Sequence, residues 1–386
     1  MKLLFLRLFE SYIDNVVLFE LEKMGVEVIT HTYYTPDDFY HDDKLYESLS
    51  SDIEKEDCDA VFTVNVWPLV SKAAHRYGKK YLAWSYDCPQ NLSKDDYLDY
   101  EESFIFLFDR WEVSDYRSRG LKSVYHMPLA VSCDFWDEKL SGKDDDPIDI
   151  SLVGSVYEST FPGLLSAMDP YEKGFFRGIA DAQRKVFGYY MIDDLITDEH
   201  LKKIDKLLRK TPSDTMHMLR RRMSYSIATY LTFQDRLSFL SLLSKRYDLH
   251  FYTGSIPDNI KPLLTDVRLN GWADYEEDMP VIFKNSRINL CPTLRAIRSG
   301  IPLRALDIMG CKGLLLTPYQ SELAENFVSG EELYMYGSIE EAFGLVDRLL
   351  SNDSERKEIA AKGYEKVRRD FTYNDRFSRM FEIAGL

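Results

Sequence analysis

Short apolar runs alternate with amphipathic segments along most of the chain, and this alternation limits the possible folds more than any other feature. In the first third, the runs recur about every 20 to 30 residues, and segments such as 15–24 and 68–77 between them have helical spacing. Strands that alternate with helices in this way form parallel sheets. We therefore predict a first doubly wound α/β domain with strands over 2–8, 26–33, 59–65, 80–86, 103–108 and 123–127.

A polar segment, 137–147, interrupts the pattern and predicts a linker, after which a second strand series begins. An almost wholly helical stretch, 160–245, separates the first two strands of that series, and Thr197 is a candidate N-cap within it. We predict strands over 148–155, 247–255, 266–271, 287–291, 313–317 and 332–336. The predicted organisation is a domain over 1–136, the linker, a second domain over 148–371 with the helical insertion, and a C-terminal helix over 372–386.

Composition excludes several classes of protein. The chain has 386 residues, of which 45% are hydrophobic, which is enough to form two hydrophobic cores. Its formal net charge of −16 argues against a nucleic-acid partner. Five scattered cysteines without a C-x-x-C pair indicate neither a disulfide framework nor a zinc site. The N-terminal apolar run is too short for a signal peptide or a membrane span. We expect a cytoplasmic protein.

Two predicted strands of the second domain end in small turns that contain glycine. These turns are Gly154-Ser155 and Thr253-Gly254. Glycine lets the backbone approach a ligand closely and expose its N–H groups to phosphate oxygens. Glycine after a strand is also common for the turn alone, so either site by itself stays open.

The segment 293–305 contains three arginines and no acid, in a chain that is acidic overall. The three are Arg295, Arg298 and Arg304, and a helix is predicted to start near Pro302. Guanidinium groups offer paired donors to phosphate, and a helix N-terminus favours an anion. The segment therefore predicts an anion site, with solvated or acid-paired arginines as the alternative.

Asp307 lies one helical turn beyond Arg304, so the two side chains can project from the same face. A carboxylate in this position can accept two hydrogen bonds from a ribose diol. Together with the anion site, it predicts a nucleotide. The alternative is an Arg304–Asp307 surface ion pair.

Several motifs resemble one known family over nearly the full length of the chain. They are "AWSYDCP" at 83–89, "FIFLFDR" at 104–110, "HMPLAV" at 126–131, "DISLVGS" at 149–155, "NGWADYEEDMPVIFKNSRINLCPT" at 270–293, and "GIPLRALDIMGCKGLLLT" followed by "YQSELAENF". This set resembles GT-B glycosyltransferases, specifically the spore-maturation-protein-like branch near glycosyltransferase family 4. The resemblance implies two Rossmann-like domains that face a cleft, with a nucleotide sugar bound by the second.

The resemblance also implies roles for individual residues. Asp307 matches the acid that binds the nucleotide ribose, and the positions expected around the diphosphate are Gly154, Ser155, Arg298 and Arg304. The segment 270–279 matches the loop that usually faces the base. Ser299 stands where many family 4 enzymes carry a glutamate that faces the donor sugar, so the sugar contact and the stereochemical outcome stay open.

The first domain should supply the acceptor side of such a site. Asp87 follows a predicted strand directly, where a carboxylate could accept the proton of an acceptor hydroxyl, and it is our candidate catalytic base. An acid that only caps the following turn is an equal alternative. His126 ends another strand and is a candidate acceptor-side residue, with a structural role as its alternative.

No established metal or phosphate-loop motif is present, and we expect neither a metal nor a cofactor besides the donor. The acidic run at 144–146 falls in the linker and is more simply a solvated charge run. Eight basic residues against two acids over 201–222 predict a basic amphipathic helix that could touch the inner face of a membrane or an acidic acceptor, with a solvated face as the alternative.

These observations predict a metal-independent hexosyltransferase-like enzyme that moves a sugar from a nucleotide diphosphate to an acceptor hydroxyl. We expect a UDP-sugar donor and a glycan, lipid-linked or protein acceptor. The C-terminal helix would act in a hinge closure that excludes water. Because Ser299 replaces a glutamate, a catalytically silent nucleotide-sugar-binding protein or partner subunit is the alternative.

Overall fold

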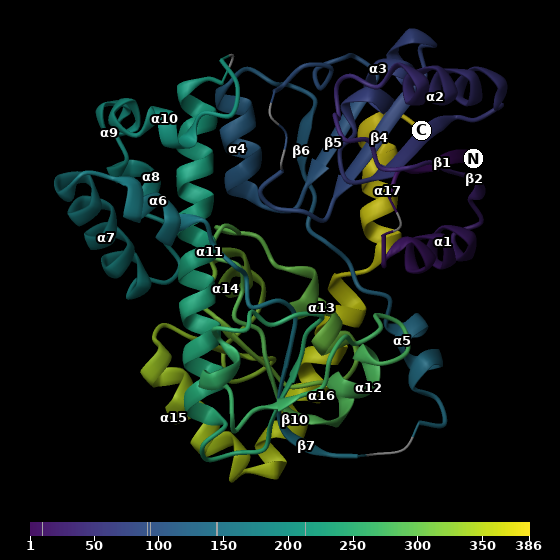
Figure 1. Ribbon diagram of the computed structural model, residues 1–386. Coiled ribbons are helices and arrows are strands. Elements are labelled where there is room, and N and C mark those ends of the chain that lie inside the picture. Colours follow the sequence, from purple (N-terminus) through teal and green to yellow (C-terminus); the bar gives the residue numbers. More distant parts are fainter. Residues whose placement is uncertain (10, 91, 93, 144–145, 213) are drawn as a thin grey trace. The chain divides into compact units, whose positions relative to one another are not determined.

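The computed structural model describes residues 1–386 apart from 10, 91, 93, 144–145 and 213. The described residues form two compact units, one of Met1–Glu138 with Lys366–Leu386 and one of Lys139–Glu365. Each unit contains a six-stranded parallel sheet with helices around it (Figure 1). Two helices, α5 (Cys133–Leu140) and α16 (Asp353–Asp370), run across the division between the units.

The first unit has the strand order β2-β1-β3-β4-β5-β6, so the direction of winding changes between β1 and β3. All pairs are parallel, which requires a crossover after each strand. The strands are β1 (Lys2–Arg7), β2 (Glu27–Thr32), β3 (Ala60–Val64), β4 (Lys80–Ser85), β5 (Ser103–Leu107) and β6 (Val124–His126), and the helices are α1 (Asp14–Lys23), α2 (Asp43–Lys55), α3 (Pro68–Arg76) and α4 (Arg110–Ser118).

The C-terminal helix α17 (Tyr373–Ala384) belongs to this first unit because its aromatic face packs on the sheet. The ring of Phe377 lies 5.6 Å from that of Phe62 on β3 and 5.6 Å from that of Trp84 on β4. Such edge-to-face pairs add to the burial of apolar area. Thr372 starts the helix by accepting a hydrogen bond from the backbone N–H of Asp375.

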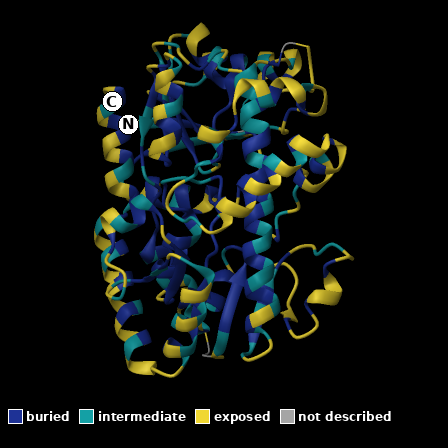
Figure 2. Ribbon diagram, turned by 90° about the vertical axis from the view of Figure 1, so that its left-hand side faces the viewer, coloured by how far each residue is buried: buried dark blue, intermediate teal, exposed yellow. Residues whose placement is uncertain are grey.

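The second unit has the strand order β12-β11-β10-β7-β8-β9, which is the order of a dinucleotide-binding sheet. Winding reverses between β7 and β10. The central strands of this sheet are mostly buried and its edge strand β9 is exposed, whereas the outer turns of the surrounding helices are exposed (Figure 2). The strands are β7 (Ile148–Val153), β8 (Leu249–Tyr252), β9 (Arg268–Leu269), β10 (Ser286–Leu290), β11 (Leu315–Pro318) and β12 (Tyr334–Tyr336), and the helices between β8 and α16 are η1 (Lys261–Leu263), α12 (Met279–Asn285), α13 (Leu303–Gly310), α14 (Ser321–Asn326) and α15 (Ile339–Leu350).

A helical insertion between β7 and β8 has a hydrophobic core of its own. Its longest helix, α11, packs on this core through Met223 and Ile227, and it packs on the core of the sheet through Phe239 and Leu243. A buried polar stretch that includes Arg236 lies between the two apolar parts of α11. The helices are α6 (Phe161–Ala167), α7 (Pro170–Arg184), α8 (Ile192–Leu195), α9 (Asp198–Lys203), α10 (Asp205–Leu208) and α11 (Met216–Leu243).

The structure confirms the α/β fold of two Rossmann-like parallel sheets, with all twelve predicted strands present. Ten of them lie within their predicted bounds, whereas β10 begins one residue earlier and β11 ends one residue later. It also confirms Thr197 as the N-cap of α9. The helix predicted over 201–222 is wrong, because this stretch is divided among α9, α10 and the start of α11. Pro212 lies in the gap and has no backbone N–H to continue a helix.

Several of the basic residues of 201–222 are also paired with acids. Arg222 pairs with the buried Asp214, Lys203 lies 2.9 Å from Glu172, and Arg220 lies 2.6 Å from Asp198. Within the described ranges, no helix is long and apolar enough to cross a membrane. Peripheral membrane contact and a cytoplasmic location stay predictions.

Candidate functional site

The candidate site of the second unit lies where the winding of its sheet reverses. The carboxyl ends of β7 and β10 are adjacent there, since Leu290 pairs in register with Leu152. Gly154 and Ser155 follow β7, and Pro292 follows β10 closely. In open α/β sheets, ligands bind outside the carboxyl ends of the strands at this reversal.

Arg236, on α11, joins the two chain segments that meet at the reversal. Its side chain is buried, with 7% of the residue exposed. Nη1 donates to the carbonyl of Ser155, and Nε and Nη2 donate to the carbonyl of Pro292 at 3.2 and 3.0 Å. Three of the five guanidinium N–H groups are thus used on backbone carbonyls. Within the described residues, Arg236 makes no ion pair.

The charge of Arg236 is therefore poorly compensated. Burial lowers the pKa of this guanidinium, and the charge of Arg304 lowers it further. The face of the Tyr157 ring, 4.7 Å from the Arg236 Cζ atom, offers weak compensation. A buried cation without a counterion carries a large desolvation cost, and a bound anion would reduce that cost.

Gly154 is required at its position for two reasons. Its φ of +140° is rarely adopted by residues with a side chain. A Cβ atom here would also lie only 3.0 Å from Arg236 Nη1. The loop after β7 thus passes directly over the guanidinium group.

We expect Gly154→Ala to lower the free energy of unfolding by about 1–3 kcal/mol, because it strains the backbone and displaces Arg236. Thermal unfolding at pH 7 measures the loss. Gly163→Ala is the matched control, since the added Cβ there meets nothing within 4 Å and lies in helix α6. Equal melting temperatures for the two variants would contradict the steric role of Gly154.

Arg304 approaches the same edge of the sheet from the first turn of α13. The helix begins after Pro302, as the sequence predicts. The Arg304 guanidinium contacts the Sδ atom of Met279 and lies 5.4 Å from the ring of Phe283. Within the described part of the chain, it pairs with no carboxylate, so a second guanidinium is available for an anion.

Asp307 is buried, with 2% of the residue exposed, and its carboxylate is only half satisfied. Oδ1 accepts a hydrogen bond from Tyr275 Oη at 3.1 Å, whereas Oδ2 has no hydrogen-bond partner among the described residues. Burial raises the pKa of Asp307 to about 7, and the opposing effects of Arg304 and Tyr275 are smaller. The alternative to a ribose-binding role, a surface ion pair with Arg304, is absent from the described residues. Buried polar atoms are nearly always hydrogen-bonded, so this oxygen is suited to accept a hydrogen bond from a bound ligand.

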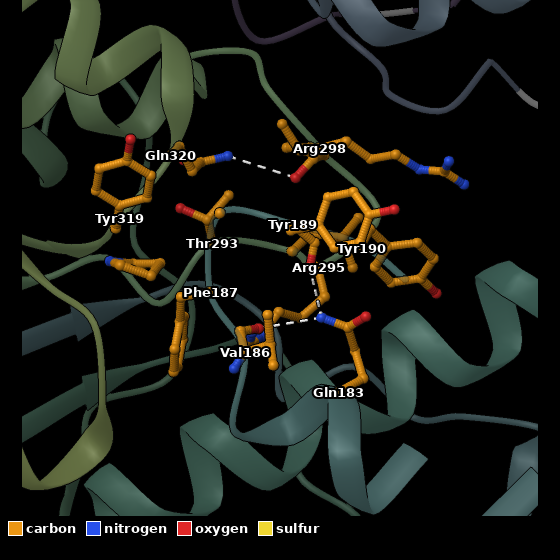
Figure 3. Close-up of a pocket in the computed structure, with 14 residues that line it drawn as sticks. Gln183, Val186, Phe187, Tyr189, Tyr190, Thr293, Arg295, Arg298, Tyr319 and Gln320 are labelled. Carbon is orange, nitrogen blue, oxygen red and sulfur yellow. Dashed lines mark hydrogen bonds between the residues drawn. The ribbon is translucent and has the colours of Figure 1, made fainter. Parts of the chain in front are cut away.

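The other two predicted arginines are paired with acids from the helical insertion. Arg295 lies 2.8 Å from Asp235 and also donates to the carbonyl of Val186. Arg298 forms an ion pair with Asp193 and stacks on the ring of Tyr190. Both line a pocket and do not carry free charge (Figure 3).

The remaining predicted donor-side residues lie around this edge. Thr253 is buried and donates to the carbonyl of Ser255, and the carbonyl of Ser299 accepts from the backbone N–H of Glu322. Gly254 is covered by the exposed ring of Trp272, since a Cβ on it would lie 3.2 Å from that ring. Trp272 itself is 74% exposed. It lies three residues before Tyr275 in the loop predicted to face the base.

In the first unit, Asp87 follows β4 at the carboxyl edge of that sheet. Asn65, which follows β3, donates from Nδ2 to Asp87 Oδ2 at 2.9 Å. Asn65 Oδ1 accepts from the backbone N–H groups of Tyr86 and Asp87. Part of Asp87 is exposed, but neighbouring atoms crowd its carboxyl group, and this desolvation raises its pKa, while Asn65 opposes the rise. Asn65 has a φ of 61°, which Asn tolerates better than most residues.

His126 ends β6 with Nε2 lying 3.3 Å from the carbonyl oxygen of Phe108. The predicted site residues thus lie at the carboxyl edges of their own sheets. Sequence reasoning missed Arg236 and Asn65. The adjacent charges Asp235 and Arg236 within an apolar helical pattern were the one available signal for the arginine.

No cluster of three or more His, Cys, Asp or Glu side chains that could hold a metal ion occurs in the described ranges. The acidic run 144–146 lies partly outside those ranges.

Comparison with known proteins agrees with this geometry. A family model described as "Glycosyl transferase-like" matches residues 236–382. Comparison with curated protein sequences gives no significant match. Similar solved structures include a glycosyltransferase from Rickettsia africae, with a TM-score of 0.56, 12% identity and coverage of 99% of this chain and 97% of that one.

Two further structures share the fold over the full chain. HepE of Anabaena in complex with UDP and glucose has a TM-score of 0.54 at 11% identity and covers 100% of both chains. A sucrose-phosphate synthase from Thermosynechococcus elongatus has a TM-score of 0.54 at 13% identity, with coverage of 99% and 98%. The chain therefore has the GT-B fold, and its residues 236–382 are similar to a glycosyl transferase-like family model.

Proposed function

We propose that the protein is a metal-independent glycosyltransferase that moves a sugar from a UDP-sugar to an acceptor hydroxyl. The observation that carries this proposal is the pair of guanidinium groups, Arg236 and Arg304, without ion-pair partners among the described residues at the carboxyl edge of a nucleotide-binding type of sheet. The structure of HepE with UDP and glucose supports UDP as the nucleotide. The second unit would be the donor domain.

On the donor side, the two arginines and the backbone around Gly154 would hold the diphosphate. Asp307 would accept hydrogen bonds from the ribose diol through its unsatisfied oxygen. The exposed Trp272 ring above Gly254 would stack on the base. As the diphosphate departs with the bonding electron pair, these fixed positive groups would stabilise its growing charge.

On the acceptor side, we assign the base role to Asp87 in the first unit. Its carboxylate would take the proton of the acceptor hydroxyl while the oxygen bonds to the anomeric carbon and the bond to the diphosphate breaks. Asn65 would hold the carboxylate in place through its 2.9 Å hydrogen bond. His126 would lie on the same side, and the acceptor class would be a glycan, lipid-linked sugar or protein.

The test is nucleotide binding followed by turnover. UDP at about 100 times its dissociation constant should stabilise the fold by roughly 2.7 kcal/mol, and GDP, TDP and CMP should do less. Arg304→Ala should abolish the shift, whereas Arg287→Ala, at the opposite end of β10, should keep it. If none of the nucleotides raises the melting temperature, the donor site does not exist.

Asp87→Asn separates the enzyme from its alternative. For an enzyme we expect a loss of about 100-fold or more in transfer rate with unchanged UDP binding. Ser299 in place of a glutamate favours the alternative of a catalytically silent nucleotide-sugar-binding partner, which would bind UDP and show no turnover with any acceptor. The spore-maturation-protein-like branch is likewise our assignment from the motifs.

A further inference from the structure

A cavity within the helical insertion is separate from the proposed donor site. It lies between α6, α7 and α11, which pack against one another (Figure 1), and its volume is about 270 Å³. A cavity of about 150 Å³ engineered into another protein binds benzene, so this one has room for an apolar group larger than a single ring. The described residues that line it all belong to the insertion, and none of the residues assigned to the donor site is among them.

Part of the cavity wall is buried and apolar. Phe161 and Leu165 of α6 and Ala180 of α7 line the cavity and are almost completely buried. The partly exposed ring of Tyr230 on α11 lies 5.3 Å from the Phe161 ring and continues this surface. Transfer of an apolar group from water onto such a surface is favourable by roughly 25 cal/mol per Å² of area buried. The wall therefore suits an apolar ligand.

Two basic side chains line the cavity on the α7 side. Lys173 and Arg177 are four residues apart, so both project from the same face of this helix. Among the described residues, neither side chain forms an ion pair or a hydrogen bond. This differs from Lys203, Arg220 and Arg222 of the same insertion, each of which is paired with an acid. Two unpaired like charges one turn apart repel each other, and a bound anion relieves that repulsion.

Asp181 limits the charge of a ligand that fits this cavity. It lines the cavity one helical turn beyond Arg177, and within the described part of the chain its exposed carboxylate has no ion-pair or hydrogen-bond partner either. The two cations and this one acid carry a net charge of +1 at pH 7. A carboxylate neutralises this charge and matches the paired N–H groups of a guanidinium, whereas the nearly double charge of a phosphate monoester exceeds it. The cavity therefore favours a monoanion.

We propose that this cavity binds a small carboxylic acid with an apolar body, such as a medium-chain fatty acid or an aryl carboxylate. The apolar body lies against Phe161, Leu165 and Tyr230, and the carboxylate accepts hydrogen bonds from Lys173 and Arg177. The site has no part in the sugar transfer proposed above, and its occupancy does not depend on that proposal. The helical insertion thus carries a ligand site of its own.

Isothermal titration calorimetry of the full chain with three small molecules tests the proposal. Octanoate has both the charge and the apolar chain, octanamide keeps the chain without the charge, and acetate keeps the charge without the chain. We expect octanoate to bind with one molecule per chain and at least about tenfold more tightly than either of the others. The ratio of the affinities of 2-naphthoate and octanoate then shows whether the site prefers a ring or an acyl chain.

Two variants locate the binding at the cavity. Arg177 and Ser166 are exposed, so substitutions at either position should leave the fold intact, which a melting curve checks. Arg177→Gln removes one of the two cations and should weaken octanoate binding about tenfold. Ser166→Phe fills the cavity with a ring and should abolish the binding. Lys202→Gln is the matched control, because it removes one exposed cation of the insertion that does not line the cavity.

The proposal is supported if octanoate binds more tightly than octanamide and acetate, and if the two cavity variants weaken or abolish this binding while Lys202→Gln keeps it. Equal affinities for octanoate and octanamide would show that the cations take no part and would overturn it. Equal affinities for octanoate and acetate would overturn the role of the apolar wall. Undetectable binding of octanoate, or equal weakening by Arg177→Gln and Lys202→Gln, would likewise exclude this site.

Discussion

Asp307→Asn is expected to make the free protein more stable at pH 8 and to weaken its binding of UDP. The folded-state pKa of about 7 lies above the ordinary value of 3.8 for aspartate, because burial disfavours the charged form. The folded protein therefore holds the proton more tightly than the unfolded chain, and stability falls as the pH rises from about 4 to 7. The difference between these two pKa values corresponds to about 4 kcal/mol of stability.

Asparagine has no proton to lose, and its Oδ1 atom can still accept from Tyr275 Oη. The variant should therefore melt about 5 °C or more above the wild type at pH 8, with a smaller difference at pH 5. Asp266→Asn, at an exposed position of the same unit, should change neither property. A variant that melts with the wild type at both pH values would contradict the buried charge.

The same titration should appear in nucleotide binding. The ribose diol donates two hydrogen bonds best to an ionised carboxylate, so the dissociation constant of UDP should fall as the pH rises from 6 to 8 and then level off. Calorimetry across this range, with Asp307→Asn as the pH-independent reference, measures the effect. Binding that weakens with rising pH would argue against Asp307 as the ribose ligand.

Arg236→Met is expected to weaken UDP binding about 100-fold. The change removes a desolvated cation next to the proposed diphosphate, and charge-assisted hydrogen bonds are worth about 1.5–3 kcal/mol each. It also leaves the carbonyls of Ser155 and Pro292 without their donor, so both segments lose their fixed spacing. Fluorescence or calorimetric titration with UDP measures the loss.

Arg236→Lys distinguishes the effect of the positive charge from that of the hydrogen bonds to the carbonyls of Ser155 and Pro292. Lysine keeps the charge but lacks the planar fork that reaches two carbonyls, so we expect an intermediate affinity. Arg287→Met, at the amino end of β10, controls for the loss of one arginine from the same unit. If Arg236→Met binds UDP as well as this control, Arg236 only joins the two segments, and the proposed anion site must rest on Arg304 alone.

Most of the fold follows from local patterns in the sequence. The strands of both sheets are predicted by their apolar runs, and the start of α13 at Pro302 is predicted by the fixed φ and missing N–H of proline. The single helix predicted over 201–222 is wrong, because the apolar periodicity continues across Pro212 but the backbone helix does not. The position of Gly154 after β7 was predictable from the sequence. The packing of the Arg236 guanidinium against this glycine was not, because the two residues are far apart in the chain.

The sequence alone determined two parallel sheets, the approximate positions of their strands, and an arginine-rich segment that follows one strand, because such features depend on residues close together in the chain. Only the tertiary structure decided which arginines are available to a ligand. Arg295 is neutralised by an acid 60 residues away, and Arg236 reaches Ser155 across 81 residues. Whether a charge is free depends on which distant side chains fold against it, and no local pattern records that.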